Sequence, residues 1–113
     1  MKRKMEKIVD KYTYCIEWFK ENNSHMARCL EFPSLAAHGE IISKALREIE
    51  KVIEASVEWM MEEGEQIPEP LGEKTFKGHI SLRIPPELHR SLAMQAAGQG
   101  ISINRLISSR LRV

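Results

Sequence analysis

Apolar and polar side chains alternate from residue 12 to residue 19, which is the period of a β-strand with one face against a core. Residues 20–23, Lys-Glu-Asn-Asn, have the composition of a turn. A second extended run over residues 24–32 would then return beside the first strand. A hairpin centred on this turn would place Cys15 opposite Cys29.

Proline next interrupts the extended pattern and a helical pattern follows. Pro33 and Ser34 are expected to break the second strand before a short third strand near residues 35–40. From residue 42 to residue 63 the apolar residues recur at threes and fours, the signature of an amphipathic helix that Gly64 ends. They are Ile42, Ala45, Leu46, Ile49, Val52, Ile53, Val57, Met60 and Met61. The first half therefore predicts three strands and a helix that buries one stripe on one sheet face.

Residues 65–78 are rich in proline and glycine and are expected to connect two domains. The domains predicted on either side are residues 1–70 and residues 79–113, with residues 71–78 as a linker. Lys74 to Lys77 would add a short strand at most. The fold class expected is α+β.

The last 35 residues or so predict strand, helix, glycine turn and helix. Residues 79–84 alternate strictly, with three apolar side chains on one face. Pro86 suits the first turn of the helix that follows, over residues 86–97, because a proline lacks the N–H that would be unpaired there. Residues 98–100, Gly-Gln-Gly, end that helix, and Ser102 is expected to cap a second one. The apolar face of that second helix comprises Ile103, Leu106, Ile107 and Leu111.

A lone strand in this C-terminal unit would leave its N–H and C=O groups unpaired. Pairing with the same strand of a second chain satisfies them, and a two-stranded ribbon fits the DNA major groove. Dimerisation would thus be part of the fold, and dimer and higher oligomer both remain open as the final assembly. The outward side chains expected to read bases are His79, Ser81 and Arg83. The residues expected at phosphates are Lys77, Ser102, Asn104 and Arg105.

Charge divides the chain in the same way. Residues 1–70 hold 10 basic and 14 acidic side chains, whereas residues 71–113 hold 7 basic and 2 acidic. A basic C-terminal part suits DNA, and an acidic N-terminal part suits a basic protein. Four helix glutamates at intervals of four residues form a like-charged ladder, and a bound basic protein would reduce the repulsion within it. The alternative is that these glutamates form a solvated helix face. These are Glu50, Glu54, Glu58 and Glu62.

Several kinds of site are not expected. Zinc could be held only where the hairpin brings together Cys15, Cys29, His25 and His38, and their spacing matches no common ligand pattern. No cofactor is implied, and no apolar run approaches the roughly 20 residues of a membrane helix. With two cysteines and no signal-peptide pattern, a cytoplasmic protein with free thiols is expected.

The C-terminal segment resembles the ribbon-helix-helix family of repressors and antitoxins. The resemblance lies in the alternating strand, the Pro-Pro-Glu-Leu entry at residues 85–88 and the Gly-Ile-Ser-Ile-Asn run at residues 100–104, which is similar to that family's Gly-x-Ser-x-Asn signature. It covers about 35 residues. It implies a dimeric module that binds an operator with two-fold symmetry.

The N-terminal half resembles the antitoxin domain of the HicB type over about 60 residues. The matching positions are Tyr14, the Phe-Pro-Ser-Leu corner at residues 32–35, Gly39, Ala45 and the Pro-Glu-Pro run at residues 68–70. Ser34 replaces the usual glycine of the corner, and Ile41 stands where a threonine cap is common. The resemblance implies a reduced, RNase-H-like sheet that binds a small mRNA-cleaving toxin of the HicA type.

The function expected is an antitoxin that neutralises such a toxin, represses its own operon and catalyses nothing. One alternative is a stand-alone repressor whose N-terminal domain binds a ligand or mediates assembly. Another is an RNase-H-like nuclease. A two-metal nuclease needs clustered carboxylates, usually including aspartates, and Asp10 is the single aspartate of the chain.

Overall fold

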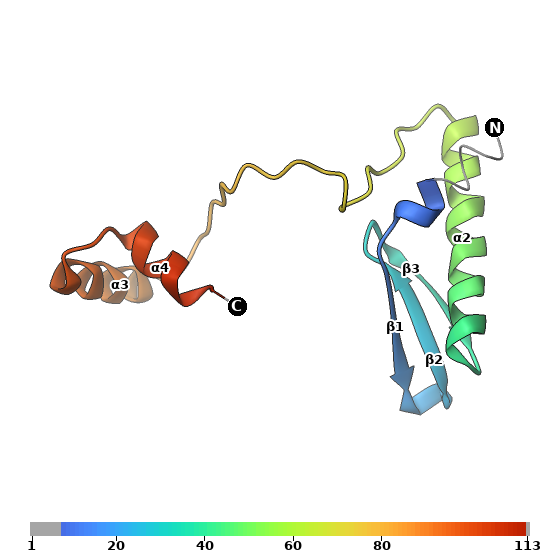
Figure 1. Cartoon of the computed structure of the whole chain (residues 1–113), viewed down its shortest axis with the longest axis horizontal. Helices are drawn as coiled ribbons and strands as arrows, with labels where there is room; N and C mark the ends of the chain where they lie inside the picture. Colours follow the sequence, from blue (N-terminus) through green and yellow to red (C-terminus); the bar gives the residue numbers. More distant parts are fainter. Residues whose placement is uncertain (1–7, 113) are drawn as a thin grey trace. The chain divides into compact units, whose positions relative to one another are not determined.

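The computed structural model describes residues 8–112, which form two compact units divided between Phe76 and Lys77. The N-terminal unit contains a three-stranded antiparallel sheet and one long helix, α2 (Figure 1). The C-terminal unit contains two shorter helices, α3 and α4. The α+β fold class expected from the sequence is confirmed.

Strands β1, Tyr14–Phe19, and β2, Ser24–Cys29, form a hairpin through the short 3-10 helix Lys20–Asn22. Asn23 closes the turn in the left-handed region at φ 49°, which asparagine tolerates better than most residues. Strand β3, Phe32–Gly39, pairs with β2, so the sheet order is β1-β2-β3.

The register of the hairpin corrects the expected pairing of the two cysteines. Tyr14 lies opposite Cys29, and Cys15 lies opposite Arg28. Because successive strand residues point to opposite faces, this one-residue offset separates the two thiols. Cys29 is buried under the helix, whereas Cys15 is exposed on the other face of the sheet. The zinc arrangement in which both would converge is therefore excluded by the geometry.

The second turn also differs from expectation. Leu30 and Glu31 form it, and β3 begins at Phe32 and includes Pro33, which was expected to end a strand. Pairing jumps from Cys29 with Phe32 to Arg28 with Ala36, so the residues between them on β3 form an irregularity. Strand β3 is an edge strand, where a missing N–H costs no ladder hydrogen bond.

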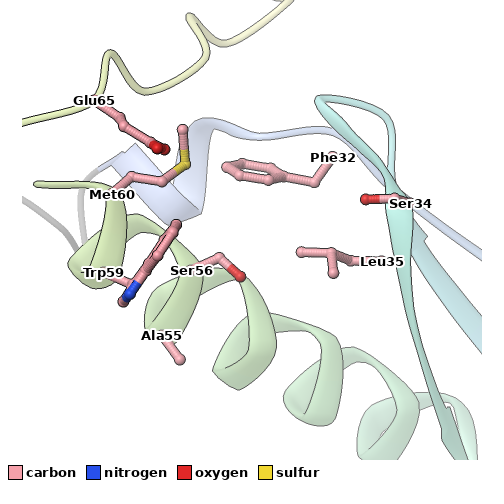
Figure 2. Close-up of a pocket in the computed structure, with 8 residues that line it drawn as sticks. All are labelled: Phe32, Ser34, Leu35, Ala55, Ser56, Trp59, Met60 and Glu65. Carbon is pink, nitrogen blue, oxygen red and sulfur yellow. The ribbon is translucent and has the colours of Figure 1, made fainter. Parts of the chain in front are cut away.

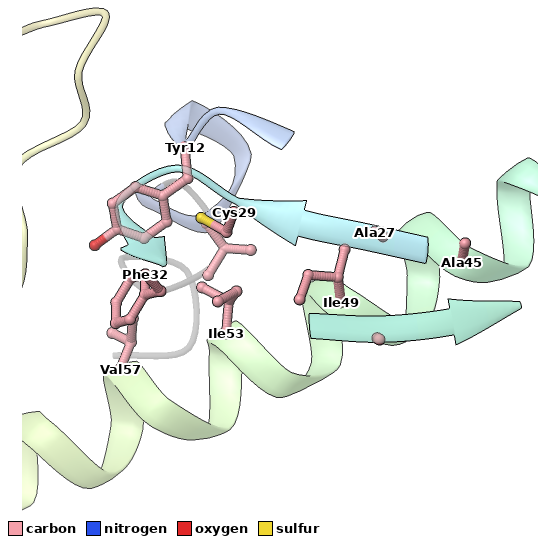
Figure 3. Close-up of a cluster of buried hydrophobic side chains, with 10 residues drawn as sticks. Tyr12, Ala27, Cys29, Phe32, Ala45, Ile49, Ile53 and Val57 are labelled. Atoms are coloured by element: carbon pink, nitrogen blue, oxygen red, sulfur yellow. The ribbon is translucent and has the colours of Figure 1, made fainter. Parts of the chain in front are cut away.

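Helix α2, Ile42–Glu62, packs its apolar stripe against one face of the sheet (Figure 3). The stripe consists of Ala45, Ile49, Ile53 and Val57, all fully buried. They meet Ala27 and Cys29 of β2, and Phe32, at the start of β3, is in edge-to-face contact with Tyr12. Each large aliphatic side chain buried here contributes about 1.5–3 kcal/mol. The helix and its buried face agree with the sequence pattern.

Gly64 ends α2 as expected. It adopts φ 73°, its N–H bonds to the carbonyl of Met61, and the N–H of Glu65 bonds to the carbonyl of Met60. This pair of bonds is a Schellman motif, which satisfies the last carbonyls of a helix and sets the direction of the chain beyond it.

Residues 68–73, called here the strap, return to the N-terminal unit instead of starting a free linker. The hydroxyl of Tyr12 donates to the carbonyl of Pro68 at 2.8 Å. Glu31 accepts from the N–H of Leu71 at 2.9 Å, and Lys11 lies 2.7 Å from Glu73. The short strand considered for residues 74–77 does not form: the described residues 65–85 contain neither helix nor strand.

In the C-terminal unit, α3 spans Pro86–Gln99 and α4 spans Ile103–Arg110. Pro86 opens α3, and Gly100, at φ 69°, ends it, two residues later than expected. Ala96 and Leu106 are buried between the helices, and the guanidinium of Arg110 donates to the side chain of Gln95. The helix, glycine turn and helix predicted from the sequence are confirmed.

Residues 79–84 do not form a strand in the single chain. A strand is defined by the ladder of hydrogen bonds to a neighbour, and the described part of this chain supplies none here. The alternation of apolar and polar side chains is present in these residues, but the strand that it predicted has no hydrogen-bonded neighbour in the described chain.

Candidate functional site

The C-terminal unit has an apolar groove between residues 80–84 and α4. Its volume is about 290 Å³. Its lining consists of Ile80, Leu82, Ile84, His89, Ile103, Asn104, Ile107 and Leu111. Ile80 is 83% exposed and Leu82 is 72% exposed, which is unusual for consecutive apolar positions of one face. The three apolar side chains expected on one side of the strand thus face the apolar side of α4; Ile80 and Leu82 are largely uncovered, whereas Ile84 is half-buried.

The side chains expected to read bases alternate with that apolar row. His79, Ser81 and Arg83 are all exposed. His79 lines a second hollow together with Asn104, so one expected base-reading residue and one expected phosphate-binding residue lie at the same place. Ser81 and Arg83 line neither hollow.

Three of the four residues expected at phosphates lie at the start of α4. The Oγ of Ser102 accepts from the N–H of Arg105 at 3.1 Å, which makes Ser102 the helix cap that the sequence predicts. The side chains of Asn104 and Arg105 are exposed, as is Lys77 at the start of the unit. A capped helix start with basic and amide side chains is chemically suited to a phosphate.

The groove and the exposed backbone of residues 79–84 would both be completed by a second strand. Pairing two such segments antiparallel would cover the apolar row and leave the polar side chains on the outer face. In a two-stranded ribbon of this kind Ser81 and Arg83 would lie on the outer face, whereas in the single chain His79 borders the hollow beside α4.

The N-terminal unit presents an acidic helix. Glu50 and Glu54 are half-buried along the sheet, and Glu58 and Glu62 are exposed near the end of α2. In residues 8–112 none of these four carboxylates forms an ion pair, and Lys51 pairs with Glu48 instead. Burial raises the pKa of Tyr14, and nearby charges that include Glu50 add to this effect. The four carboxylates therefore lack ion-pair partners in the described residues, and only Glu58 and Glu62 are exposed to solvent.

A hollow lies beside Trp59, between β3 and the last turns of α2 (Figure 2). Its volume is about 390 Å³, and it is called here the Trp59 hollow. Its lining residues are Phe32, Ser34, Leu35, Ala55, Ser56, Trp59, Met60 and Glu65. The sequence pattern did not reveal it, because it depends on β3 starting at Phe32. A tryptophan within an acidic run was the signal available in the sequence.

Glu31 is the second residue whose role the sequence did not reveal. Its carboxylate accepts from the backbone N–H and hydroxyl of Thr13, the N–H of Leu71 and the thiol of Cys29. Burial alone raises the pKa of Glu31, but the bonds from Leu71 and Thr13 outweigh it and hold the pKa below 4.5. Glu31 joins the start of β1 to the strap and is a structural residue of the turn.

The described residues show no cluster suited to metal chemistry. Within them, no group of three or more His, Cys, Asp or Glu side chains could hold a metal ion. Burial raises the pKa of the Cys29 thiol to about 11, which disfavours the thiolate that metals bind. Asp10 lies in a helical turn before β1. No described helix has the length and apolar character needed to cross a bilayer.

Comparison with known proteins relates the C-terminal part of the chain to one family. Residues 61–111, just under half of the chain, match the sequence model of the HicB family. The matched range begins in the last turn of α2 and includes the strap, residues 79–84 and both C-terminal helices. No curated protein and no solved structure matches the chain. The match supports an antitoxin of the HicB type.

Proposed function

We propose that this protein is the antitoxin of a type II toxin-antitoxin pair. Its N-terminal unit, a reduced RNase-H-like sheet with α2, binds and neutralises a small basic mRNA-cleaving toxin of the HicA type. Its C-terminal unit is a ribbon-helix-helix module that dimerises and represses the operon by binding operator DNA. The protein performs no catalysis. The match of residues 61–111 to the HicB family supports the antitoxin role.

The observation that carries the DNA-binding half is the apolar row beside α4, in which Ile80 and Leu82 are largely uncovered and Ile84 is half-buried. Burying one exposed side chain of this kind contributes about 1.5–3 kcal/mol, so Ile80 and Leu82 from both chains of a symmetric pair would offset a substantial loss of association entropy. The pairing would leave His79, Ser81 and Arg83 along the major groove, where Arg83 suits the O6 and N7 atoms of guanine. Lys77, Ser102, Asn104 and Arg105 would contact phosphates.

The toxin-binding half is supported by charge. The carboxylates of Glu58 and Glu62 are exposed on α2 with no ion pair in the described chain. A basic partner would relieve the like-charge repulsion of the Glu50–Glu62 ladder, about 0.2–0.5 kcal/mol per pair. The same surface would repel nucleic acid, so the two units would serve two different partners.

Co-expression with the short reading frame beside the gene tests the proposal. The tagged full chain is expected to retain that product in a pull-down, restore growth when the product is toxic, and retard DNA from upstream of its own operon. DNA binding without a toxic or interacting neighbour would leave a stand-alone repressor. Binding of the neighbouring gene product without binding of DNA would contradict the proposed role as a repressor.

A further inference from the structure

The chain around the end of α2 is acidic to an unusual degree. Residues 52–73 contain seven glutamates and no lysine, arginine or histidine. Glu73 is paired with Lys11, and no ion pair involves the other six within residues 8–112. In the middle of this run stands Trp59, 56% exposed, although tryptophan is usually buried for most of its surface. Acidic charge and exposed aromatic surface thus occur together.

The Trp59 hollow gives this surface a defined shape. Phe32 and Leu35 line it from β3, Trp59 and Met60 line it from α2, and Glu65 stands at its edge (Figure 2). Phe32 belongs to the buried core, and the Schellman motif at Gly64 fixes the turn that carries Glu65. The hollow is therefore built on fixed elements and is mostly apolar inside.

Carboxylates lie on one side of the apolar interior, at the end of α2. Glu62 and Glu63 follow Trp59 by three and four residues, so their side chains lie next to the indole on the helix surface. Glu65 itself lines the hollow. A ligand entering here would meet apolar walls at the centre and negative charge on the side formed by the end of α2.

We propose that the Trp59 hollow is the docking site of the basic toxin, with one apolar side chain of the toxin in the hollow and basic side chains against Glu62, Glu63 and Glu65. This inference rests on the proposed function and moves the centre of the interface from the middle of the glutamate ladder to its exposed end. Interfaces commonly place such an anchor at the centre of a polar rim. Charge complementarity selects the occupant: the toxin expected is basic, whereas a second copy of this surface or a nucleic acid would be repelled.

Matched pairs of variants test the site in the full-length chain against the product of the neighbouring reading frame. Trp59→Ala is expected to raise the Kd at least about 30-fold, the size of a hot-spot residue. Trp18→Ala is the control, because Trp18 is 53% exposed in the same unit and lies at the far end of β1. Wild-type-like melting of both variants separates lost binding from lost folding.

A second pair of variants tests the charged rim. E62Q/E63Q/E65Q is expected to weaken binding and to flatten its dependence on salt concentration. E17Q/E21Q/E40Q removes as many exposed carboxylates from the hairpin and the loop before α2 and is expected to change neither.

The outcomes separate the site from the function. A wild-type chain that does not bind the neighbouring product overturns the proposed function and the site with it. A wild-type chain that binds, with Trp59→Ala equal to Trp18→Ala, overturns the site alone. A change in the mass of the chain by itself in Trp59→Ala would assign the hollow to self-association and overturn the toxin as its occupant.

Discussion

The carboxylate of Glu31 accepts a hydrogen bond from the backbone N–H of Leu71 at 2.9 Å, across 40 residues of sequence. The same carboxylate holds the N–H of Thr13 at 2.8 Å. One side chain in a two-residue turn thus joins the start of β1 to the strap beyond α2.

Glu31→Ala is expected to destabilise the N-terminal unit by roughly 1–3 kcal/mol, because two backbone N–H groups lose a charged acceptor. Urea unfolding followed by tryptophan fluorescence measures this unit alone, since Trp18 and Trp59 both lie in it. Glu17→Ala, which removes an exposed strand carboxylate, is the control and should remain within about 0.5 kcal/mol of wild type.

At low pH the difference in free energy of unfolding between Glu31→Ala and wild type is expected to disappear. The pKa of Glu31 is lowered from 4.5 in the folded protein, so the carboxylate stabilises the fold fully above pH 4.5. Its contribution is lost as the pH falls through the lower, folded-state pKa. Unfolding curves at a series of pH values check this, and a difference that persists unchanged at low pH would contradict the role of the charge.

Gly39→Ala is expected to be costly because α2 begins directly over Gly39. A Cβ there would lie 2.8 Å from the Cα of Ala45 and 2.8 Å from the carbonyl carbon of Lys44, so backbone would have to move. The expected loss is about 1–3 kcal/mol. Gly72→Ala is the matched control, since a Cβ at Gly72 meets nothing within 4 Å. Equal melting temperatures for the two variants would contradict this packing.

Leu82→Glu is expected to convert the chain from dimer to monomer, because it places a charge in the apolar row of the paired segments. Met94→Glu changes a residue of similar exposure on α3 outside the groove, and it should leave the dimer intact. Light scattering after gel filtration gives the mass of each. If Leu82→Glu forms a dimer as stable as that of the wild type, residues 79–84 do not pair between chains and the proposed ribbon is contradicted.

Arg83→Ala is expected to weaken operator binding by about 1–3 kcal/mol and to leave toxin binding unchanged. Arg90→Ala removes the same charge from an exposed position of α3 and serves as the control. Gel-shift titrations on operator DNA and on unrelated DNA distinguish a lost base contact from a lost phosphate contact. Loss of a phosphate contact weakens binding to both DNAs equally, whereas loss of a base contact weakens binding to the operator more. Loss of toxin binding with Arg83→Ala would contradict separate roles for the two units.

Where an element depends on local periodicity and its neighbours lie within the same chain, the sequence predicted it well; the alternation of residues 79–84 predicted a strand that the single chain does not form. The buried stripe of α2 at Ala45, Ile49, Ile53 and Val57 follows from apolar spacing alone. The caps at Ser102 and Gly100 follow from side-chain chemistry within one turn of the chain. Such features need no information about distant residues.

The features that were missed depend on contacts across the sheet or across the chain. The pairing of Cys15 depends on the 3-10 turn at Lys20–Asn22, because one residue of register reverses a face. The strap depends on Glu31, which no periodicity distinguishes from other surface glutamates. The Trp59 hollow depends on two such features: β3 must begin at Phe32, and the chain must turn at Gly64.

The strap is also the segment of the folded N-terminal unit that is expected to open first. It is held by the bonds to Tyr12 and Glu31, a half-exposed ion pair to Glu73 and little buried surface beyond Pro70. Local opening of such a segment costs far less free energy than global unfolding, so its amide hydrogens should exchange with solvent before those of the sheet. Each opening would expose the chain beyond Gly64 to a protease while the core around Ile49 and Ile53 stays intact.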